Sequence, residues 1–160
     1  MRRKILYGLV LVLVLIQFMR PSRNISNTIS ANDISKLYSV PDSVQHLLSV
    51  ACNDCHSNNS VYPWYTNIQP VGWWMQNHIN EGKHDLNFSE FGSYEPEKAA
   101  HIMKETAEKV KEKDMPLNSY TWVHKDASLS DQQIKLLVDW SNDIRQSIIQ
   151  KNNLPPSNKY

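Results

Sequence analysis

The only two cysteines of this 160-residue chain lie three positions apart, and a histidine follows the second: Cys52-Asn53-Asp54-Cys55-His56. At a helical turn, this spacing lets both thiols reach the vinyl groups on one edge of a haem, while the adjacent imidazole turns onto the iron. A haem attached in this way cannot dissociate, and it would form the centre of the core. The motif therefore predicts a chain that folds around covalent haem c.

Three other interpretations of the cysteine pair stay open. A redox-active Cys-x-x-Cys pair normally follows a strand in a βαβ unit, whereas here a helical pattern leads into the motif. A zinc site could combine Cys52 and Cys55 with two of His56, His78 and His84. A disulfide between cysteines three apart would be strained and would close a trivial loop.

The iron needs a sixth ligand, or it keeps an open position for chemistry. Met115 is the predicted ligand, because it follows the end of a predicted helix and Pro116 stiffens the loop after it. Met75 and Met103 fall at internal helical positions and are predicted core residues. Ligation by a second histidine stays open, with His78, His84, His101 and His124 as its candidates.

The N-terminus has the layout of an export signal. The uncharged run of 15 residues from 5 to 19, ILYGLVLVLVLIQFM, follows Arg2-Arg3-Lys4 and precedes Arg20. No small-x-small cleavage site follows directly, so we expect an uncleaved signal anchor. The run reaches about 22 Å, which spans a ~30 Å hydrocarbon core only if flanking residues snorkel or the bilayer thins.

Export fits the haem hypothesis, because covalent haem attachment takes place on the outer side of the bacterial membrane. The positive-inside rule puts residues after about 24 outside the cytoplasm. We therefore expect a membrane-anchored protein at the periplasmic face of the inner membrane, with secretion to the periplasm as the alternative.

The charge distribution argues against nucleic acid as a partner. Of the 17 basic and 16 acidic side chains, five basic and no acidic ones lie in residues 1–23, so the rest of the chain has an excess of four acids. Phosphate neutralisation needs clustered Lys and Arg. The expected partners are instead the membrane, through the N-terminal helix, and a redox protein.

The chain is predicted to be mainly α, because no alternating β-type segment of useful length occurs. Helices are expected over 42–51, 71–81 with Gly82 as its end, 95–113 and 130–150. The last of these begins with a capping box of Ser130 and Gln133. The predicted organisation is a signal anchor (1–23), a tether (24–40), a haem-binding domain (41–150) and a loose tail (151–160).

Residues 41 to 145 resemble a small bacterial haem-binding-domain family of exported proteins related to the monohaem c-type cytochromes. The match rests on CNDCHSNNSVYPWY (52–65), VGWWMQNHINEGKHDLNFSEF (71–91), DMPLNSY (114–120) and LSDQQIKLLVDW (129–140). The resemblance implies a small cytochrome c-like helical domain with Cys52 and Cys55 as thioether positions. It also implies His56 as the proximal ligand and Met115 as the matching distal one.

An electron carrier, rather than an enzyme, is the function expected from these features. A haem-based sensor of small ligands, or a peroxidase-like site with an open sixth position, is the alternative, and a zinc-binding module comes third. Five aromatic residues are predicted to cover the haem faces as ordinary core: Trp64, Tyr65, Trp73, Trp74 and Trp122.

Overall fold

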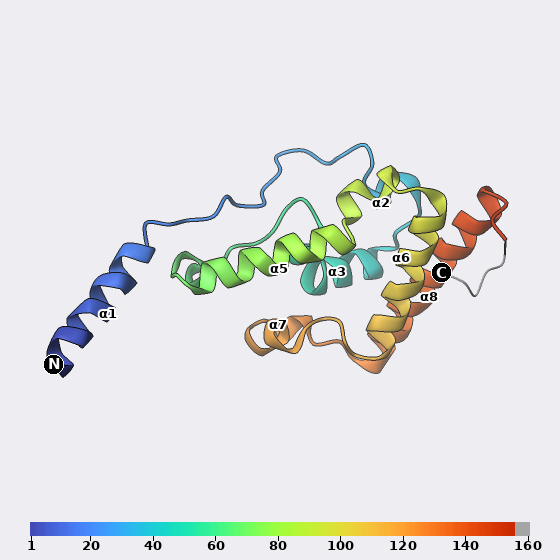
Figure 1. Cartoon of the computed structure of the whole chain (residues 1–160). Helices are drawn as coiled ribbons and strands as arrows, with labels where there is room; N and C mark the ends of the chain where they lie inside the picture. The colour runs from blue at the N-terminus through green and yellow to red at the C-terminus, as the bar shows by residue number, and fades with distance from the viewer. Residues whose placement is uncertain (156–160) are drawn as a thin grey trace.

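Helices are the only regular secondary structure in residues 1–155, the part of the chain that this computed structural model describes (Figure 1). This confirms the prediction of a mainly α fold. The α-helices are α1 (Arg2–Ile16), α2 (Ile34–Leu37), α3 (Asp42–Ala51), α4 (Asn53–His56), α5 (Val71–Asp85), α6 (Pro96–Lys111), α7 (Asn118–Val123) and α8 (Asp131–Lys151). Three short 3-10 helices, η1 (Trp64–Asn67), η2 (Phe88–Ser93) and η3 (Lys125–Ala127), lie between them.

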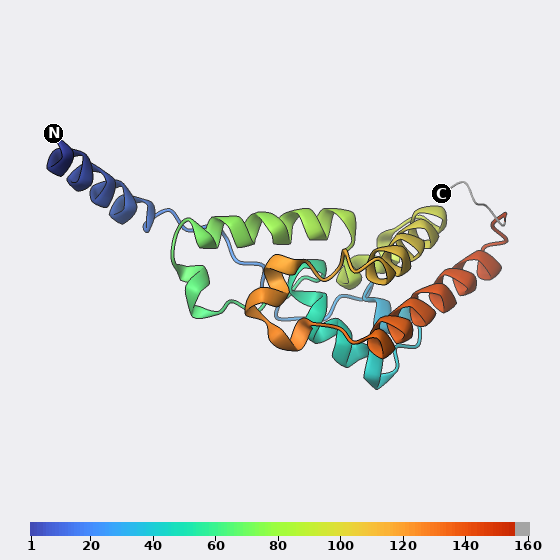
Figure 2. The same ribbon diagram turned by 90° about the horizontal axis from the view of Figure 1, so that it is seen from below.

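The N-terminal helix α1 stands apart from the rest of the chain in both views (Figures 1 and 2). None of its residues is buried. No helix within residues 1–155 is both long and apolar enough to cross a membrane. The predicted N-terminal membrane helix is therefore not supported: the 15 residues of α1 extend about 22 Å, less than a ~30 Å hydrocarbon core.

The main core lies where α6 and α8 pack against each other and α3 and η2 add their apolar faces. The predicted apolar faces of α3, α6 and α8 are confirmed, and Met103 is fully buried as expected. The core includes Val44, Leu47, Leu48, Phe88, Phe91, Ile102, Met103, Val110, Leu137, Trp140, Ile144 and Ile148.

The predicted capping box at the start of α8 is confirmed. The Ser130 hydroxyl accepts a hydrogen bond from the Gln133 amide at 3.3 Å, and the Gln133 side chain accepts one from the Ser130 amide at 2.8 Å. The helix continues to Lys151, the first residue of the predicted loose tail. Residues 156–160 of that tail lie outside the described part of the chain.

The segment predicted as a tether (24–40) lies against the domain instead of hanging free. The Asn24 amide donates to the Tyr62 hydroxyl at 2.6 Å, and Lys83 donates to the Asn24 side-chain oxygen at 2.6 Å. Ile34 in α2 belongs to the buried core. The packed unit thus begins before the predicted boundary at 41, because polar groups of a Ser- and Asn-rich segment make specific contacts that composition does not reveal.

Helix α5 does not end at Gly82, as predicted, but continues through it to Asp85. A Cβ atom at Gly82 would lie 2.8 Å from the Cys55 carbonyl oxygen and 3.0 Å from its Cβ atom. The glycine is therefore needed for close packing rather than for ending the helix. It brings the last turns of α5 directly onto the Cys-x-x-Cys-His motif.

Replacing Ser141 by alanine is expected to preserve or raise stability, by about 1 kcal/mol, because a buried hydroxyl without a partner carries only its desolvation cost. Ser141 is 1% exposed, and its oxygen has no hydrogen-bond partner among the described residues. Urea unfolding of the full chain measures the change. The control is Ser130→Ala, which removes a helix cap and should cost ~1 kcal/mol. A similar loss in Ser141→Ala would contradict the expectation.

Candidate haem site

A cavity of about 300 Å³ brings together the four predicted site residues, Cys52, Cys55, His56 and Met115. One wall is the motif itself, at the end of α3 and in α4. A second is the C-terminal half of α5, and a third is the segment 115–120, which leads into α7. Residues separated by about 60 positions in the sequence thus line one space.

The two thiols lie on a single turn because Cys52 interrupts the helix that leads into the motif. Its backbone leaves the α-helical region (φ −129°, ψ −46°), so α3 ends at Ala51 and a new turn, α4, begins. The amides of Cys55 and His56 both donate to the Cys52 carbonyl, at 3.1 and 3.0 Å. This turn holds both thiols and the imidazole at the wall of the cavity.

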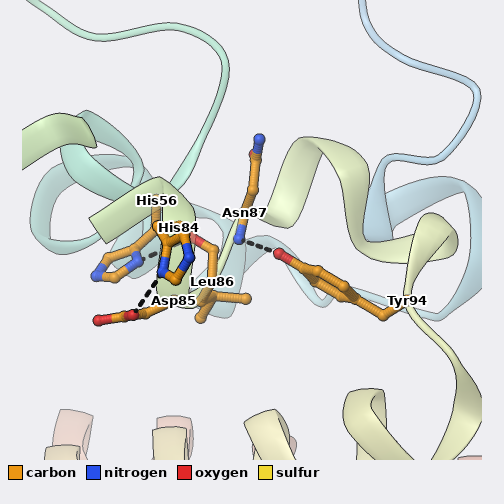
Figure 3. Close-up of polar contacts among 6 residues, drawn as sticks. All are labelled: His56, His84, Asp85, Leu86, Asn87 and Tyr94. Atoms are coloured by element: carbon orange, nitrogen blue, oxygen red, sulfur yellow. Dashed lines mark hydrogen bonds and ion pairs between the residues drawn. The ribbon is translucent and has the colours of Figure 1, made fainter. Parts of the chain in front are cut away.

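His56 is oriented by a backbone carbonyl. Its Nδ1 lies 3.0 Å from the Leu86 oxygen (Figure 3). A carbonyl can only accept, so Nδ1 carries a proton, and in the neutral imidazole the lone pair is then on Nε2. This is the second-sphere arrangement that fixes the tautomer of a metal-binding histidine.

The peptide group between Leu86 and Asn87, whose carbonyl bonds His56, is itself held in place. Its N–H belongs to Asn87 and donates to the Tyr94 hydroxyl at 2.9 Å (Figure 3). Because the peptide is planar, this contact on one side fixes the direction of the Leu86 carbonyl on the other. Neither Leu86 nor Tyr94 was identified from the sequence, since a carbonyl acceptor carries no residue signature.

Backbone hydrogen bonds hold Met115 just after the end of α6. The amides of Asp114 and Met115 both donate to the Lys109 carbonyl, at 3.0 and 3.2 Å, and the Lys109 ammonium bonds the Asp114 carboxylate at 2.8 Å. Met115 is half-buried and packs against the core. Its thioether is thus available on the cavity wall formed by 115–120.

The structure separates the four histidines considered as alternative ligands. Only His78 shares the cavity with the motif, and its Nδ1 bonds the Trp74 carbonyl at 2.9 Å. His84 is exposed and contacts Asp85 (Figure 3). His101 lies in a small pocket beside Arg145, and His124 lines an adjoining cavity with Nε2 3.1 Å from the Tyr65 hydroxyl.

The surroundings of the thiols do not favour a redox pair. Burial is the main cause that raises the pKa of Cys52 to about 12, and the charge of the neighbouring Cys55 is the second cause. Burial is also the main cause that raises the pKa of Cys55 to about 11, and the Asp54 carboxylate is the second cause. Reactive disulfide exchangers need the opposite shift, toward thiolate at neutral pH.

Of the residues considered for the zinc alternative, Cys52, Cys55, His56 and His78 line this cavity. Within residues 1–155, no group of three or more His, Cys, Asp or Glu side chains is arranged to hold a metal ion. His84, one of its proposed ligands, lies outside the cavity that the cysteines line.

Asp54, between the two cysteines, is a further residue of the site. It is only 7% exposed. One carboxylate oxygen accepts from the Val61 amide at 2.8 Å, and the other from the Tyr120 hydroxyl at 2.8 Å. Burial and the negative charge of Asp54 together raise the pKa of Tyr120. No local sequence signal pairs these two residues, which lie 66 positions apart.

The prediction that the aromatic residues cover the haem faces as core is wrong for Trp64 and Trp122, which are 75% and 79% exposed and line neither cavity beside the motif, whereas the half-exposed Trp74 lines the adjoining one. These residues lie on η1, α7 and the first turns of α5, whereas the main core lies between α6, α8 and α3. Tyr65 lines the adjoining cavity of about 60 Å³, together with the half-buried Met75.

A family model described as the haem-binding domain matches residues 11–143. This stretch includes the motif, α5 and the segment that carries Met115. No curated protein and no solved structure matches the chain.

Proposed function

We propose, on the premise that the chain belongs to the haem-binding domain family, that it attaches haem c covalently and carries single electrons. The observation that carries the proposal is the common cavity of Cys52, Cys55, His56 and Met115. Two thiols would attach the haem through thioether bonds, and one imidazole and one thioether side chain would be the two protein ligands of its iron. Bound haem supplies one-electron exchange between the ferric and ferrous states of its iron.

The residues of the cavity fit this role individually. Cys52 and Cys55 supply the sulfur atoms of the two thioether bonds, and His56 offers an Nε2 lone pair whose direction the Leu86 carbonyl fixes. Gly82 keeps the wall of α5 free of a Cβ atom where it meets Cys55. Met115 would be the second protein ligand of the iron, and its soft thioether would favour the ferrous state and raise the reduction potential.

Electron transfer is favoured over ligand sensing or peroxidase chemistry, because two side chains, Met115 and His78, line the cavity and can fill a sixth position. A carrier exchanges electrons with the least cost when its coordination does not change. We propose a redox protein as its partner.

We propose further that the chain is exported. Support comes from Arg2, Arg3 and Lys4 ahead of the apolar residues of α1, none of which the domain buries. Export would bring the cysteines to the side of the membrane where haem c is attached.

The test is production of the full chain in a host that attaches haem c, followed by haem staining of a denaturing gel. We expect stained protein in the fraction outside the cytoplasm and a redox titration that follows a single one-electron step. A colourless, zinc-containing product would contradict haem attachment. A fast CO-induced spectral change in the reduced wild-type protein at neutral pH would contradict a closed sixth position.

A further inference from the structure

The segment that carries Met115 is fixed at two points. At its start, the Met115 amide donates to the Lys109 carbonyl at the end of α6, at 3.2 Å. At its other end, the Tyr120 hydroxyl donates to a carboxylate oxygen of Asp54 at 2.8 Å. Asp54 lies between the two cysteines, so this second contact runs from the Met115 segment straight to the attachment motif.

Both partners of this contact are held in place by other neighbours. The second oxygen of Asp54 accepts from the Val61 amide at 2.8 Å, which fixes the rotation of the buried carboxylate. The Tyr120 ring stacks on His124 with centroids 4.1 Å apart and an interplanar angle of 32°. Tyr120 and Asp54 line the same cavity as Met115 and His56.

We propose that the hydrogen bond between Tyr120 and Asp54 positions Met115 as the sixth ligand. The inference rests on the proposed function, and it assigns Tyr120 and Asp54 as positioning residues. With the bond made, the segment 115–120 is held at both ends and the thioether stays at a set separation from the motif. With the bond broken, the segment loses its hydrogen bond to the motif, and the thioether leaves the iron more often.

The experiment uses the full-length haem-containing protein and compares Tyr120→Phe with wild type. CO binding to the ferrous state is limited by departure of the methionine, so its rate reports how firmly Met115 is held. We expect about a tenfold faster rate in Tyr120→Phe, as for the loss of one hydrogen bond to a charged group. The ferric charge-transfer absorption of the methionine–iron bond should weaken, and the reduction potential should fall.

Two matched variants separate positioning from a general loss of packing. Tyr65→Phe removes a neighbouring hydroxyl that bonds His124 at 3.1 Å but does not touch the motif, and it should leave the CO rate unchanged. Asp54→Asn leaves one acceptor oxygen for two donors and removes the charge, so it should speed CO binding in the same direction as Tyr120→Phe.

The outcomes are distinct. Wild-type CO kinetics in Tyr120→Phe overturn the proposal, and so does an equal acceleration in Tyr65→Phe. Wild-type CO kinetics in Asp54→Asn would show that the carboxylate does not hold the segment, and would also overturn it. Met115→Ala tests the ligand itself. If it keeps the charge-transfer band, the ligand assignment fails together with this inference; if it loses the band while Tyr120→Phe is unchanged, only this inference fails.

Discussion

Replacing Cys52 and Cys55 together by alanine is expected to abolish covalent haem attachment. The chain has no other cysteine, so no thioether bond can form at another position. Haem staining of a denaturing gel should change from positive to negative in the double variant. The matched control is Ser49→Ala, an exposed residue of the helix that leads into the motif, which should stain like wild type. Stain that survives denaturation of the double variant would contradict thioether attachment.

His56→Ala complements this change without touching the thiols. It removes the imidazole and leaves the Leu86 carbonyl without its 3.0 Å partner. We expect little stable haem-containing protein, because the iron would lose its proximal ligand. Recovery of a folded, red His56→Ala protein with the wild-type spectrum would overturn the ligand assignment.

Met115→Ala is expected to vacate one axial position of the iron. The reduced protein should then bind CO rapidly, the ferric charge-transfer absorption of the methionine–iron bond should disappear, and the potential should fall, because a soft thioether favours the ferrous state. Absorption spectra of both oxidation states and a redox titration measure these changes.

The other methionines provide controls for Met115→Ala. Met103 is fully buried in the core, and Met75 lines the adjoining cavity. Met103→Leu and Met75→Leu should cost only packing, under ~1.5 kcal/mol each, and leave the spectra unchanged. If Met115→Ala keeps the wild-type spectra, His78 is the next ligand to replace, since it alone of the four candidate histidines lines the cavity.

The helices that build the core could be predicted from the sequence, because their signals are local. The apolar spacing of α3, α6 and α8 repeats every three to four residues, as a helix that packs on one side requires. The start of α8 is marked by a capping box of Ser130 and Gln133, which lie three positions apart. These features lie within one or two helical turns, and sequence position alone brings them together.

Other elements depended on contacts that sequence proximity does not reveal. Gly82 looked like a helix end, but it lies inside α5 because the helix packs on Cys55 there. The segment 24–40 looked like a linker, but Asn24 and Ile34 anchor it to the domain. Trp64 and Trp122 looked like core, but most of each side chain is exposed to solvent.

The sequence by itself determined the chemistry that this protein can offer: two thiols and an imidazole in one turn, and a thioether after a helix. Covalent order sets those spacings, so no fold is needed to see them. Only the tertiary structure decided how these groups are held. The Leu86 carbonyl reaches His56 across 30 positions, and Tyr120 reaches Asp54 across 66. Such contacts form only when helices of distant sequence pack together, because the hydrogen bonds depend on where the backbone runs in space.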